Sequence, residues 1–325
     1  MEVRTTISPL PHFFRRIHFL AASLRALGGE LANHEIVVSV GGGDYENYYE
    51  TQPWSNAYPL TWRRVPPDAY ARLGYRATNR DRAAHVARAE FVMMVDADVI
   101  VLRDFSSLLA ELRAEPAIVG VMAHISPFKV MTLKPDAAER MGADRSDAAC
   151  WRLLADHFGV PELRLDQQYS GWGFMDTESD RRLGPHYFNG GMVLGPRALM
   201  EKMCAYYTEA EEAVDALMDN YSRPQLARTL ACAKAGAPCR SLPARYNFPN
   251  DPVFEQFHSD EARDIAVLHY LRHDVVHRDR DFTDRDAVDR LVARADLTGS
   301  NEELRRRVAE LRQRVFALEK HAISW

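Results

Sequence analysis

The sequence contains few cysteines, no long apolar run and no surplus of positive charge. Four of its 325 residues are cysteines, and they are widely separated and form no C-x-x-C pair: Cys150, Cys204, Cys232 and Cys239. This spacing excludes a disulfide framework and predicts reduced thiols in a cytoplasmic protein. No stretch approaches the roughly 20 apolar residues that cross a bilayer, so any membrane contact is expected to be peripheral.

The charge balance argues against a nucleic-acid partner. Lys and Arg number 41 and Asp and Glu number 46, which gives a formal net charge of −5. Binding to phosphate backbones needs a basic surplus, which this chain lacks. Hydrophobic residues make up 46% and charged residues 27% of the sequence, which is ordinary globular composition. The apolar run at residues 17–24 is short, contains His18 and is followed by Arg25, so it does not predict a signal peptide.

The first half of the chain alternates helical and strand patterns. Apolar spacing predicts helices over residues 13–27, 81–89 and 106–113 and strands over residues 36–40 and 91–95. The first helix is followed by a glycine pair suited to a C-cap, and a serine at position 106 is available as the N-cap of the third. Alternation of this kind predicts an α/β domain with a mostly parallel, buried sheet flanked by helices.

The second half is less regular at first. Periodicity fades over residues 127–185, where Gly, Pro, Asp and aromatic residues accumulate, so we expect a long binding loop or lid there. Order returns with a predicted strand over residues 187–196 and a long predicted helix over residues 197–218.

The C-terminal segment has the pattern of an amphipathic helix. Residues 300–303 read Ser-Asn-Glu-Glu, a capping box, and five apolar residues then alternate four and three apart: Leu304, Val308, Leu311, Val315 and Leu318. Two interpretations stay open. The helix packs on its own domain, or it joins two copies of the chain as a homodimer.

The strongest chemical signal is a pair of aspartates after a hydrophobic strand. Asp96 and Asp98 follow five apolar residues and precede four more, which places them at the strand end where open α/β sheets bind ligands. Alternation turns the two side chains the same way, and two buried carboxylates need a cation nearby. Carboxylates suit magnesium or manganese, and such an ion neutralises the charge of a departing nucleotide diphosphate.

Three segments together resemble one family of enzymes. Residues 95–104 resemble the D-x-D signature of nucleotide-sugar glycosyltransferases with the GT-A fold. Residues 187–194, with Asn189-Gly190-Gly191, resemble the FNGG segment of the glycogenin-like and bacterial lipopolysaccharide-galactosyltransferase group, and residues 268–270 are similar to its late histidine. The resemblance implies a GT-A domain over residues 1–282, followed by a helical extension over residues 283–325. It also implies metal-dependent transfer of a sugar from a UDP-sugar to an acceptor such as a glycan, lipid-linked sugar or small molecule.

The resemblance also implies roles for individual residues. Asp96 would hold the ribose and the metal, Asp98 would bind the metal directly, and His269 would complete the protein ligands of Mn²⁺ or Mg²⁺. Two carboxylates and one imidazole leave positions for two diphosphate oxygens around an octahedral ion. The expected catalytic residues are Asn189, Gln225 and Asp176. The expected donor-binding residues are Thr6, Ile7, Asp44, Arg76, Arg80, Asp96, Ala97, Asp98, Asn189, Gly190 and Arg272.

The sequence departs from the family pattern at two places. The family histidine is usually followed by a glycine and then Lys-Pro-Trp, whereas this chain offers Arg272, Arg278 or Arg280 as diphosphate ligands. The family's Asp-Gln pair after the long helix is replaced by Pro224-Gln225, so Gln225 is expected to face the sugar without an acidic partner. Among the donor-binding candidates, Asp44, Arg76 and Arg80, like the neighbouring Asn79, are equally compatible with surface-loop positions.

Other residues with possible roles lie in the irregular stretch and after His269. Trp172, between two glycines and near Tyr169, is a candidate platform for an acceptor sugar or a packing residue. An inverting transferase would need a general base from this region, whereas a retaining one would not; the candidates are Asp166, Asp176, Glu178 and Asp180. His269, His273 and His277 stand four apart, but the strand pattern before His269 and the absence of an H-E-x-x-H motif argue against a zinc helix.

Two further functions compete with sugar transfer. A sugar-phosphate nucleotidyltransferase usually opens with a glycine-rich basic loop after its first strand, where this chain has residues 8–13, Ser-Pro-Leu-Pro-His-Phe. A non-catalytic scaffold with the same fold would not need Asp96, Asp98 and His269. The sequence therefore favours the transferase.

Overall fold

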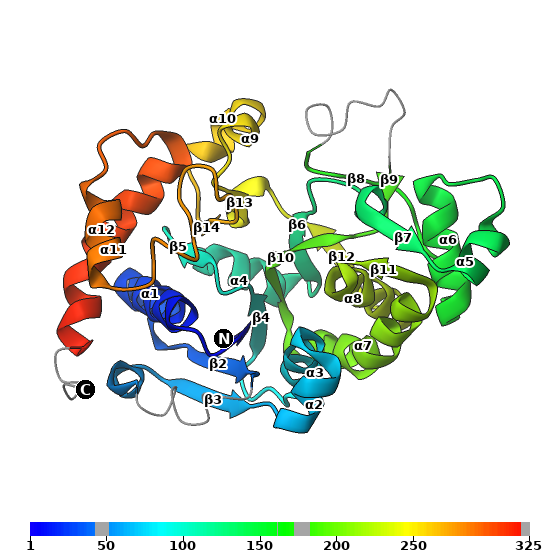
Figure 1. The fold of residues 1–325 in the computed structure, drawn as a ribbon, viewed down its shortest axis with the longest axis horizontal. Helices are drawn as coiled ribbons and strands as arrows, with labels where there is room; N and C mark the ends of the chain where they lie inside the picture. Colours follow the sequence, from blue (N-terminus) through cyan, green and yellow to red (C-terminus); the bar gives the residue numbers. More distant parts are fainter. Residues whose placement is uncertain (43–51, 161, 172–182, 320–325) are drawn as a thin grey trace.

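The computed structural model describes residues 1–42, 52–160, 162–171 and 183–319. Helices cover both faces of a central sheet (Figure 1). Its seven strands lie in the order β12 (Cys239–Ser241), β6 (Ile118–Met122), β10 (Phe188–Pro196), β4 (Phe91–Val95), β1 (Glu2–Ile7), β2 (Glu35–Val40) and β3 (Leu60–Arg64). β10 runs antiparallel to β4 and β6, and the other pairs are parallel. The expected mostly parallel sheet is therefore confirmed.

Smaller sheets and twelve helices complete the described residues. A three-stranded sheet has the order β13 (Phe248–Pro249), β14 (Val267–His269) and β5 (Val99–Val101). Two strand pairs are β11 (Met218–Asn220) with β7 (Met131–Leu133), and β8 (Gln167–Gln168) with β9 (Leu183–Gly184). The helices are α1 (Pro11–Leu27), α2 (Pro67–Leu73), α3 (Tyr75–Ala84), α4 (Ser106–Ala114), α5 (Pro135–Met141), α6 (Asp147–Phe158), α7 (Arg197–Leu217), α8 (Arg223–Lys234), α9 (Pro252–Phe257), α10 (Ser259–Ala262), α11 (Arg285–Ala293) and α12 (Gly299–Glu319).

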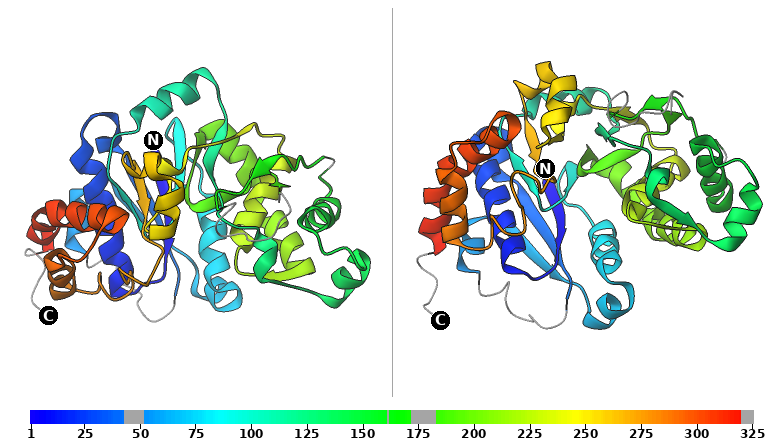
Figure 2. Two further views of the ribbon diagram at one scale, coloured as in Figure 1. Left: turned by 90° about the horizontal axis from the view of Figure 1, so that it is seen from above. Right: turned by 45° about the horizontal axis from the view of Figure 1, so that its top comes forward.

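β4 is apolar at every position because it has a core on each face. Met93 and Val95 belong to the core that contains residues of α1, α4 and α12, whereas Val92 and Met94 belong to the core formed with α6, α7 and α8. Alternate side chains of a strand point to opposite faces, so a sheet covered on both sides needs this continuous pattern. Figure 2 shows the helices on the two sides.

Most predicted elements are confirmed, but one helix differs at both ends and another differs in its N-cap. The helix expected over residues 81–89 is α3, which begins at Tyr75 and ends at Ala84, because the glycine break lies earlier, at Gly74 with φ of 58°. Ser106 is the first residue of α4 and not its N-cap. The Asp104 carboxylate accepts hydrogen bonds from the Ser106 backbone and hydroxyl.

The expectation of a long irregular stretch over residues 127–185 is wrong for its first half. α5 and α6 lie there, and α6 has regular ends: the Ser146 hydroxyl caps its first turn at the Ala149 N–H, and Gly159 ends it in the left-handed conformation. Its buried face places Trp151 and Leu154 in the core beside α7 and α8. Residues 172–182 lie outside the described part of the chain.

α12 packs on its own domain. Leu304, Val308, Leu311 and Val315 are all at most 2% exposed and lie in the core that contains residues of α1, and Figure 2 shows α12 beside α1 and α11. The apolar seam is therefore used within the chain. The expected capping box starts too late, because α12 begins at Gly299 and Ser300 already lies within its first turn. The Ser300 N–H and hydroxyl donate to the Glu255 carboxylate of α9.

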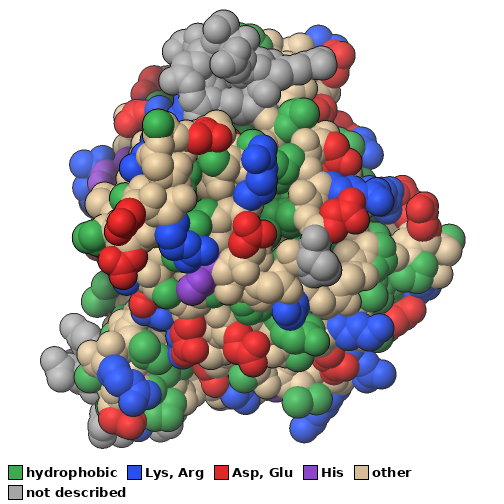
Figure 3. Space-filling model, turned by 90° about the vertical axis from the view of Figure 1, so that its right-hand side faces the viewer, with side chains coloured by type: hydrophobic (Ala, Val, Ile, Leu, Met, Phe, Trp, Pro, Cys, Tyr) green, Lys and Arg blue, Asp and Glu red, His purple; other side chains and the backbone are tan. Residues whose placement is uncertain are grey.

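The surface is mixed in charge on the face that carries α5 and α6. Acidic and basic side chains alternate there, and neither sign forms a continuous patch among the coloured atoms (Figure 3). Among the residues described, no helix is both long and apolar enough to cross a membrane.

The burial of α12 leads to a stability prediction. Replacing Leu304 with Ala is expected to lower the free energy of unfolding by about 2–5 kcal/mol, because it leaves a cavity in a closed core. Arg306→Ala, at an exposed position of the same helix, is the control and is expected to change it by less than about 1 kcal/mol. Urea unfolding measures both. Equal stability of the two variants would show that α12 is not part of the core.

Candidate functional site

The D-x-D residues lie where one sheet passes into another. β4 ends at Val95 and β5 begins at Val99, so Asp96, Ala97 and Asp98 link the seven-stranded and three-stranded sheets. β14 pairs antiparallel with β5 and sets His269 opposite Val99, while the Tyr270 N–H donates to the Asp98 carbonyl at 3.0 Å. Strand register therefore brings His269 beside the aspartates from a distant part of the sequence.

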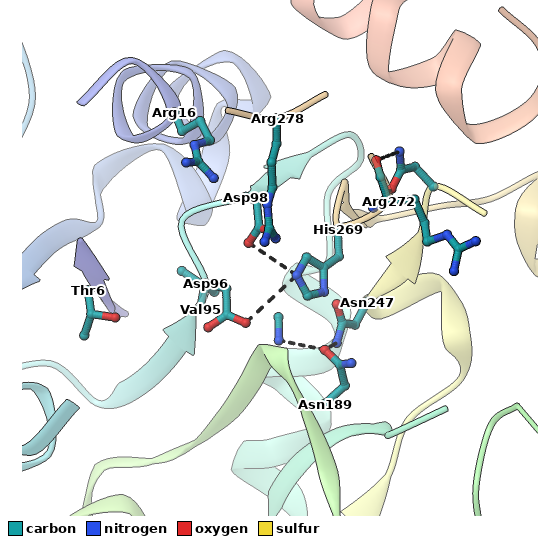
Figure 4. A network of polar contacts seen from close by, with 12 residues as sticks. Thr6, Arg16, Val95, Asp96, Asp98, Asn189, Asn247, His269, Arg272 and Arg278 are labelled. Atoms are coloured by element: carbon teal, nitrogen blue, oxygen red, sulfur yellow. Dashed lines mark hydrogen bonds and ion pairs between the residues drawn. The ribbon is translucent and has the colours of Figure 1, made fainter. Parts of the chain in front are cut away.

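The three side chains form a group that fits a divalent cation. His269 Nε2 lies 3.3 Å from Asp98 Oδ1 and 3.9 Å from Asp96 Oδ2 (Figure 4). One ligand atom from each residue lies within 4.8 Å of the others. Neighbouring ligands of a six-coordinate ion at about 2.1 Å are about 3 Å apart, so small side-chain shifts suffice. Asp98 is 6% exposed and Asp96 37% exposed, which leaves one side of the group accessible.

Two glycines of β10 make room for these ligands. A Cβ on Gly190 would lie 2.9 Å from Asp96 Oδ2, and one on Gly191 would overlap His269 Nδ1 and the Asn247 side chain. Any larger residue would displace a ligand, because these distances are shorter than real Cβ contacts. The Asn-Gly-Gly motif is therefore explained by close approach of backbone to ligand side chains.

Asn189 and Asn247 connect β10 to the segment before β13. The Asn189 side-chain oxygen accepts hydrogen bonds from the Gly191 N–H at 2.9 Å and from Asn247 Nδ2 at 3.0 Å (Figure 4). These bonds fix the turn of backbone that lies against Asp96 and His269.

Asn250 supports the histidine from the other side. Its N–H donates to the His269 carbonyl at 3.3 Å, and its side-chain oxygen accepts from the Arg272 N–H at 2.9 Å. Its Nδ2 donates to Asn301 Oδ1 of α12 at 3.0 Å. The end of β14 is thereby tied to the first turn of the C-terminal helix.

The charges of the group stabilise one another. Burial alone would raise the pKa of the Asp98 carboxyl, but His269 and Arg278 outweigh it and hold that pKa well below its usual range. Burial alone would lower the pKa of His269, and Asp98 and Asp96 raise it above its ordinary value. Asp98 is therefore ionised, and a cation that replaces the His269 proton would find two carboxylates already in place.

Arg278 is a cation that would compete with a metal ion for the Asp98 carboxylate. Its Nη1 donates to Asp98 Oδ2 (Figure 4), on a carboxylate that would also ligate the metal. A metal ion and this guanidinium compete for the same negative charge, so metal binding would free Arg278 for another anion.

The group opens into a cleft of about 730 Å³, within the range of small-molecule sites. Residues of α1 and of the segment after β14 line it, as do residues of α3, β10 and α8. Seven expected site residues lie in its wall, as does the neighbouring candidate Asn79: Asp96, Ala97, Asp98, Asn189, Gly190, Gln225 and His269. The structure therefore brings the core of the predicted site together.

Thr6 and Ile7 lie behind the cleft wall. Both are fully buried in β1, and the Thr6 hydroxyl meets the Tyr75 hydroxyl. Tyr75, not Thr6, is in the cleft wall. The end of β1 therefore contacts the cleft wall indirectly, through the hydrogen bond between Thr6 and Tyr75.

Arg76 and Arg80 point to α7 and not to the cleft. Arg76 pairs with Glu211 and Asp215, and Arg80 pairs with Glu211 at 2.6 Å. Glu211 is fully buried, so it needs these two arginines as partners. The structure places both in the contact between α3 and α7.

Several other expected residues also lie elsewhere. Arg272 pairs with Asp251 and Asp274 and is outside the cleft wall, as is Asp166, which accepts a hydrogen bond from the neighbouring Gln167 side chain. Tyr169 is buried in the core. The remaining expected residues lie outside the described part of the chain: Asp44, Trp172, Asp176, Glu178 and Asp180.

The three histidines do not form a helical stripe. His269 ends β14, whereas His273 and His277 lie in the following irregular segment and approach Asp279. The Asp279 carboxylate already accepts a hydrogen bond from Arg16 at 3.0 Å, so this second group has less free negative charge than the D-x-D group.

The cleft wall also contains polar and aromatic residues that were not expected from the sequence, among them Arg16, Tyr75, Arg82, Tyr221 and Arg228. Arg228 stands three residues after Gln225 on α8, and this helical spacing is a signal that places both on one face. Tyr75 and Arg82 stand four residues before and three residues after the candidate Asn79 on α3, which is the same kind of signal. Arg16 and Tyr221 reach the cleft through tertiary packing, for which the sequence offers no such local signal.

Comparison with known proteins identifies the fold. No protein-family model and no curated protein matches the chain. The solved apo structure of the bifunctional glycosyltransferase WbbM is similar over 98% of this chain, with a TM-score of 0.57 and 13% identity. The chain spans about half of that protein, 51% of its length.

Two weaker likenesses concern other solved glycosyltransferases. The galactosyltransferase LgtC, solved with donor and acceptor sugar analogues, has a TM-score of 0.47 and 15% identity over 84% of this chain and 87% of that one. GlyE of Streptococcus pneumoniae has a TM-score of 0.47 and 13% identity over 100% of this chain and 65% of that one. The likeness to WbbM confirms the expected glycosyltransferase-type fold, and it shows the fold alone.

The ligand geometry predicts how metal affinity responds to substitution. Asp98→Asn is expected to weaken Mn²⁺ binding by roughly 100-fold or more with the fold retained, because a neutral amide is a poor ligand for a hard cation. His269→Ala is expected to lose less and to recover at high Mn²⁺, because both carboxylates remain. Calorimetric Mn²⁺ titration with circular dichroism measures both. Unchanged affinity in Asp98→Asn would exclude this metal site.

The competition at Asp98 predicts the opposite effect for one variant. Arg278→Met is expected to tighten Mn²⁺ binding in the absence of nucleotide by about tenfold, which corresponds to about 1.4 kcal/mol, because the competing charge is gone. Arg280→Met, two residues further along the chain and 74% exposed, is the control. Mn²⁺ titration of the two variants compares them, and a weaker affinity in Arg278→Met would contradict the competition.

Proposed function

We propose that this chain is a metal-dependent glycosyltransferase that moves a sugar from a UDP-sugar to an acceptor nucleophile, such as a glycan, a lipid-linked sugar or a small molecule. The observation that carries the proposal is the Asp96, Asp98 and His269 group at the floor of a cleft large enough for a nucleotide sugar. The confirmed fold supports it.

The proposed reaction exchanges one bond at the anomeric carbon. The bond from that carbon to the diphosphate oxygen breaks, and its electron pair leaves with the diphosphate. A bond to the acceptor oxygen forms, and the acceptor proton passes to the leaving diphosphate oxygen or to solvent. A bound Mn²⁺ or Mg²⁺ would neutralise the negative charge that the leaving diphosphate gains. Asp98 and His269, which are buried, hold the ion in place, and Asp96 faces the donor.

The other cleft residues orient the donor. Arg278, once released from Asp98, binds a diphosphate oxygen through its planar fork. Asn189 and Gln225 lie on the β10 and α8 side of the aspartates and supply neutral hydrogen-bonding groups for sugar hydroxyls. Tyr221 lies in the cleft wall just before α8 and is 90% exposed. Its aromatic face could stack on a sugar ring of the donor or the acceptor.

We further propose that residues 1–282 contain the catalytic machinery and that residues 283–325 support it. All three expected metal ligands precede residue 283, and α12 contributes Asn301 to the network that holds the end of β14. The seam of α12 is buried within the chain, so the proposal does not include a dimer through that helix.

Nucleotide-sugar hydrolysis tests the function. The full chain with Mn²⁺ is expected to release UDP slowly from at least one UDP-sugar, because water replaces the acceptor, and to stop when EDTA is added. Asp98→Asn is expected to be inactive, and Asp156→Asn, at an exposed position of α6, is the matched control. Release that is independent of metal, or full activity in Asp98→Asn, would contradict the proposal. Pyrophosphate formed from UTP and a sugar phosphate would instead indicate a nucleotidyltransferase.

A further inference from the structure

Among the residues that the structure describes, no carboxylate pairs with Arg228, a buried arginine of α8. Arg228 is 3% exposed and yet is part of the cleft wall. Its Nε and Nη1 atoms are buried and make no hydrogen bond. Each unpartnered donor costs folding free energy, and more so when it carries charge. A side chain held in this way beside a cleft is a candidate for binding a ligand.

A second buried arginine stands beside it. Arg82 is 4% exposed and donates to neutral acceptors, the Val95 carbonyl at 3.3 Å and Asn79 Oδ1 at 2.7 Å. Burial and then Arg82 lower the pKa of Arg228, and an anion between the two would relieve this repulsion. The Asp96 carboxylate is close enough to Arg228 to raise its pKa, but in the proposed function Asp96 would bind the metal.

The start of α8 adds positive potential to the same side. α8 contains no Asp or Glu, and Ser222, Pro224 and Gln225 at its start are part of the cleft wall. The first turn of a helix presents unpaired N–H groups and the positive end of the helix dipole. This side of the cleft is therefore suited to a negative group.

The charges of the cleft wall indicate how much negative charge that group carries. Four arginines face three aspartates, which leaves one positive charge: Arg16, Arg82, Arg228 and Arg278 against Asp96, Asp98 and Asp279. A divalent ion raises the excess to three, and the diphosphate of the donor neutralises two. One positive charge remains, and it matches a single carboxylate better than a phosphate monoester, whose charge is nearer two.

The position of Arg228 assigns the carboxylate to the sugar. Arg16 and Arg278 lie with α1 and the segment after β14 and have carboxylate partners, Asp279 and Asp98. Arg82 and Arg228 lie on the side of Asn189 and Gln225, where the proposed function places the sugar. We propose that the donor sugar is a uronic acid, with Arg228 holding its carboxylate and Arg82 beside it. This inference rests on the proposed function.

Donor binding tests the inference directly. Calorimetry on the full chain with Mn²⁺ compares UDP-glucuronate and UDP-galacturonate with UDP-glucose and UDP-galactose. At least one uronic acid donor is expected to bind about tenfold more tightly than its neutral counterpart, because a guanidinium and a carboxylate form a charge-assisted pair. Arg228→Met is expected to remove this preference, so that acidic and neutral donors bind the variant with similar affinity. Arg152→Met, at an exposed position of α6, is the control and is expected to keep it.

Thermal stability provides a second measurement that needs no turnover. Arg228→Met keeps most of the side-chain volume and removes a buried unpartnered charge, so its Tm without ligand is expected to rise above that of the unmodified chain. UDP-glucuronate or UDP-galacturonate is expected to raise the Tm of the unmodified chain more than that of the variant. A lower Tm in Arg228→Met, together with an unchanged donor preference, would show that Arg228 is a packing residue and overturn the inference.

The remaining outcomes separate the inference from the proposed function. If neutral and acidic UDP-sugars bind equally in Mn²⁺, the uronic acid assignment is wrong and the proposed function stands. Methyl glucuronide tests the acceptor side. If it binds the complex of the chain with UDP and Mn²⁺, if this binding is lost in Arg228→Met, and if the donors show no preference, then the carboxylate belongs to the acceptor and the donor assignment is wrong. If no UDP-sugar binds, both proposals fail.

Discussion

The pairing of β14 with β5 is the constraint on which the site depends. It sets His269 opposite Val99 and fixes the Tyr270 N–H on the Asp98 carbonyl. A shift of one residue would turn the imidazole to the other face of the small sheet, and Asp98 would lose one of the two partners, His269 and Arg278, that offset its burial. β5 begins at Val99, directly after Asp98. The strand that pairs with the histidine strand therefore also fixes the position of one of the aspartates. Two of the three ligands therefore share one hydrogen-bonded ladder.

β10 supplies the complementary constraint from the large sheet. It pairs with β4 so that Met192 is opposite Val95, and its two glycines then pass directly against Asp96 and His269. The ligand group is enclosed by backbone on one side and by Arg278 on the other. This arrangement keeps the buried Asp98 carboxylate close to the partly exposed Asp96 carboxylate, and the positive charge of His269 and Arg278 offsets their repulsion.

Local patterns predicted what depends on local physics. The apolar run of β4, the helical spacing of α1 and α7 and the aspartate pair after β4 were all readable, because burial on one or both faces imposes these patterns. The family resemblance added His269, which the sequence alone does not relate to residue 98.

α6 was missed because it lies among Gly-rich and Pro-rich segments, although Ser146 and Gly159 mark its ends. Arg76 and Arg80 were assigned to the donor, whereas the buried Glu211 of a helix far along the chain binds both. Such partners follow from packing between distant elements.

The link from Asn250 to Asn301 also sets an order of assembly. All three ligands of the candidate metal group have been synthesised when residue 269 is made, but the hydrogen bond that joins their support to α12 needs residue 301. Domains complete their folding only when their late segments are available. A nascent chain that ends before α12 therefore has every ligand and an incomplete support for His269. The support for the end of β14 is therefore complete only after α12 has been made and has packed against α1 and α9.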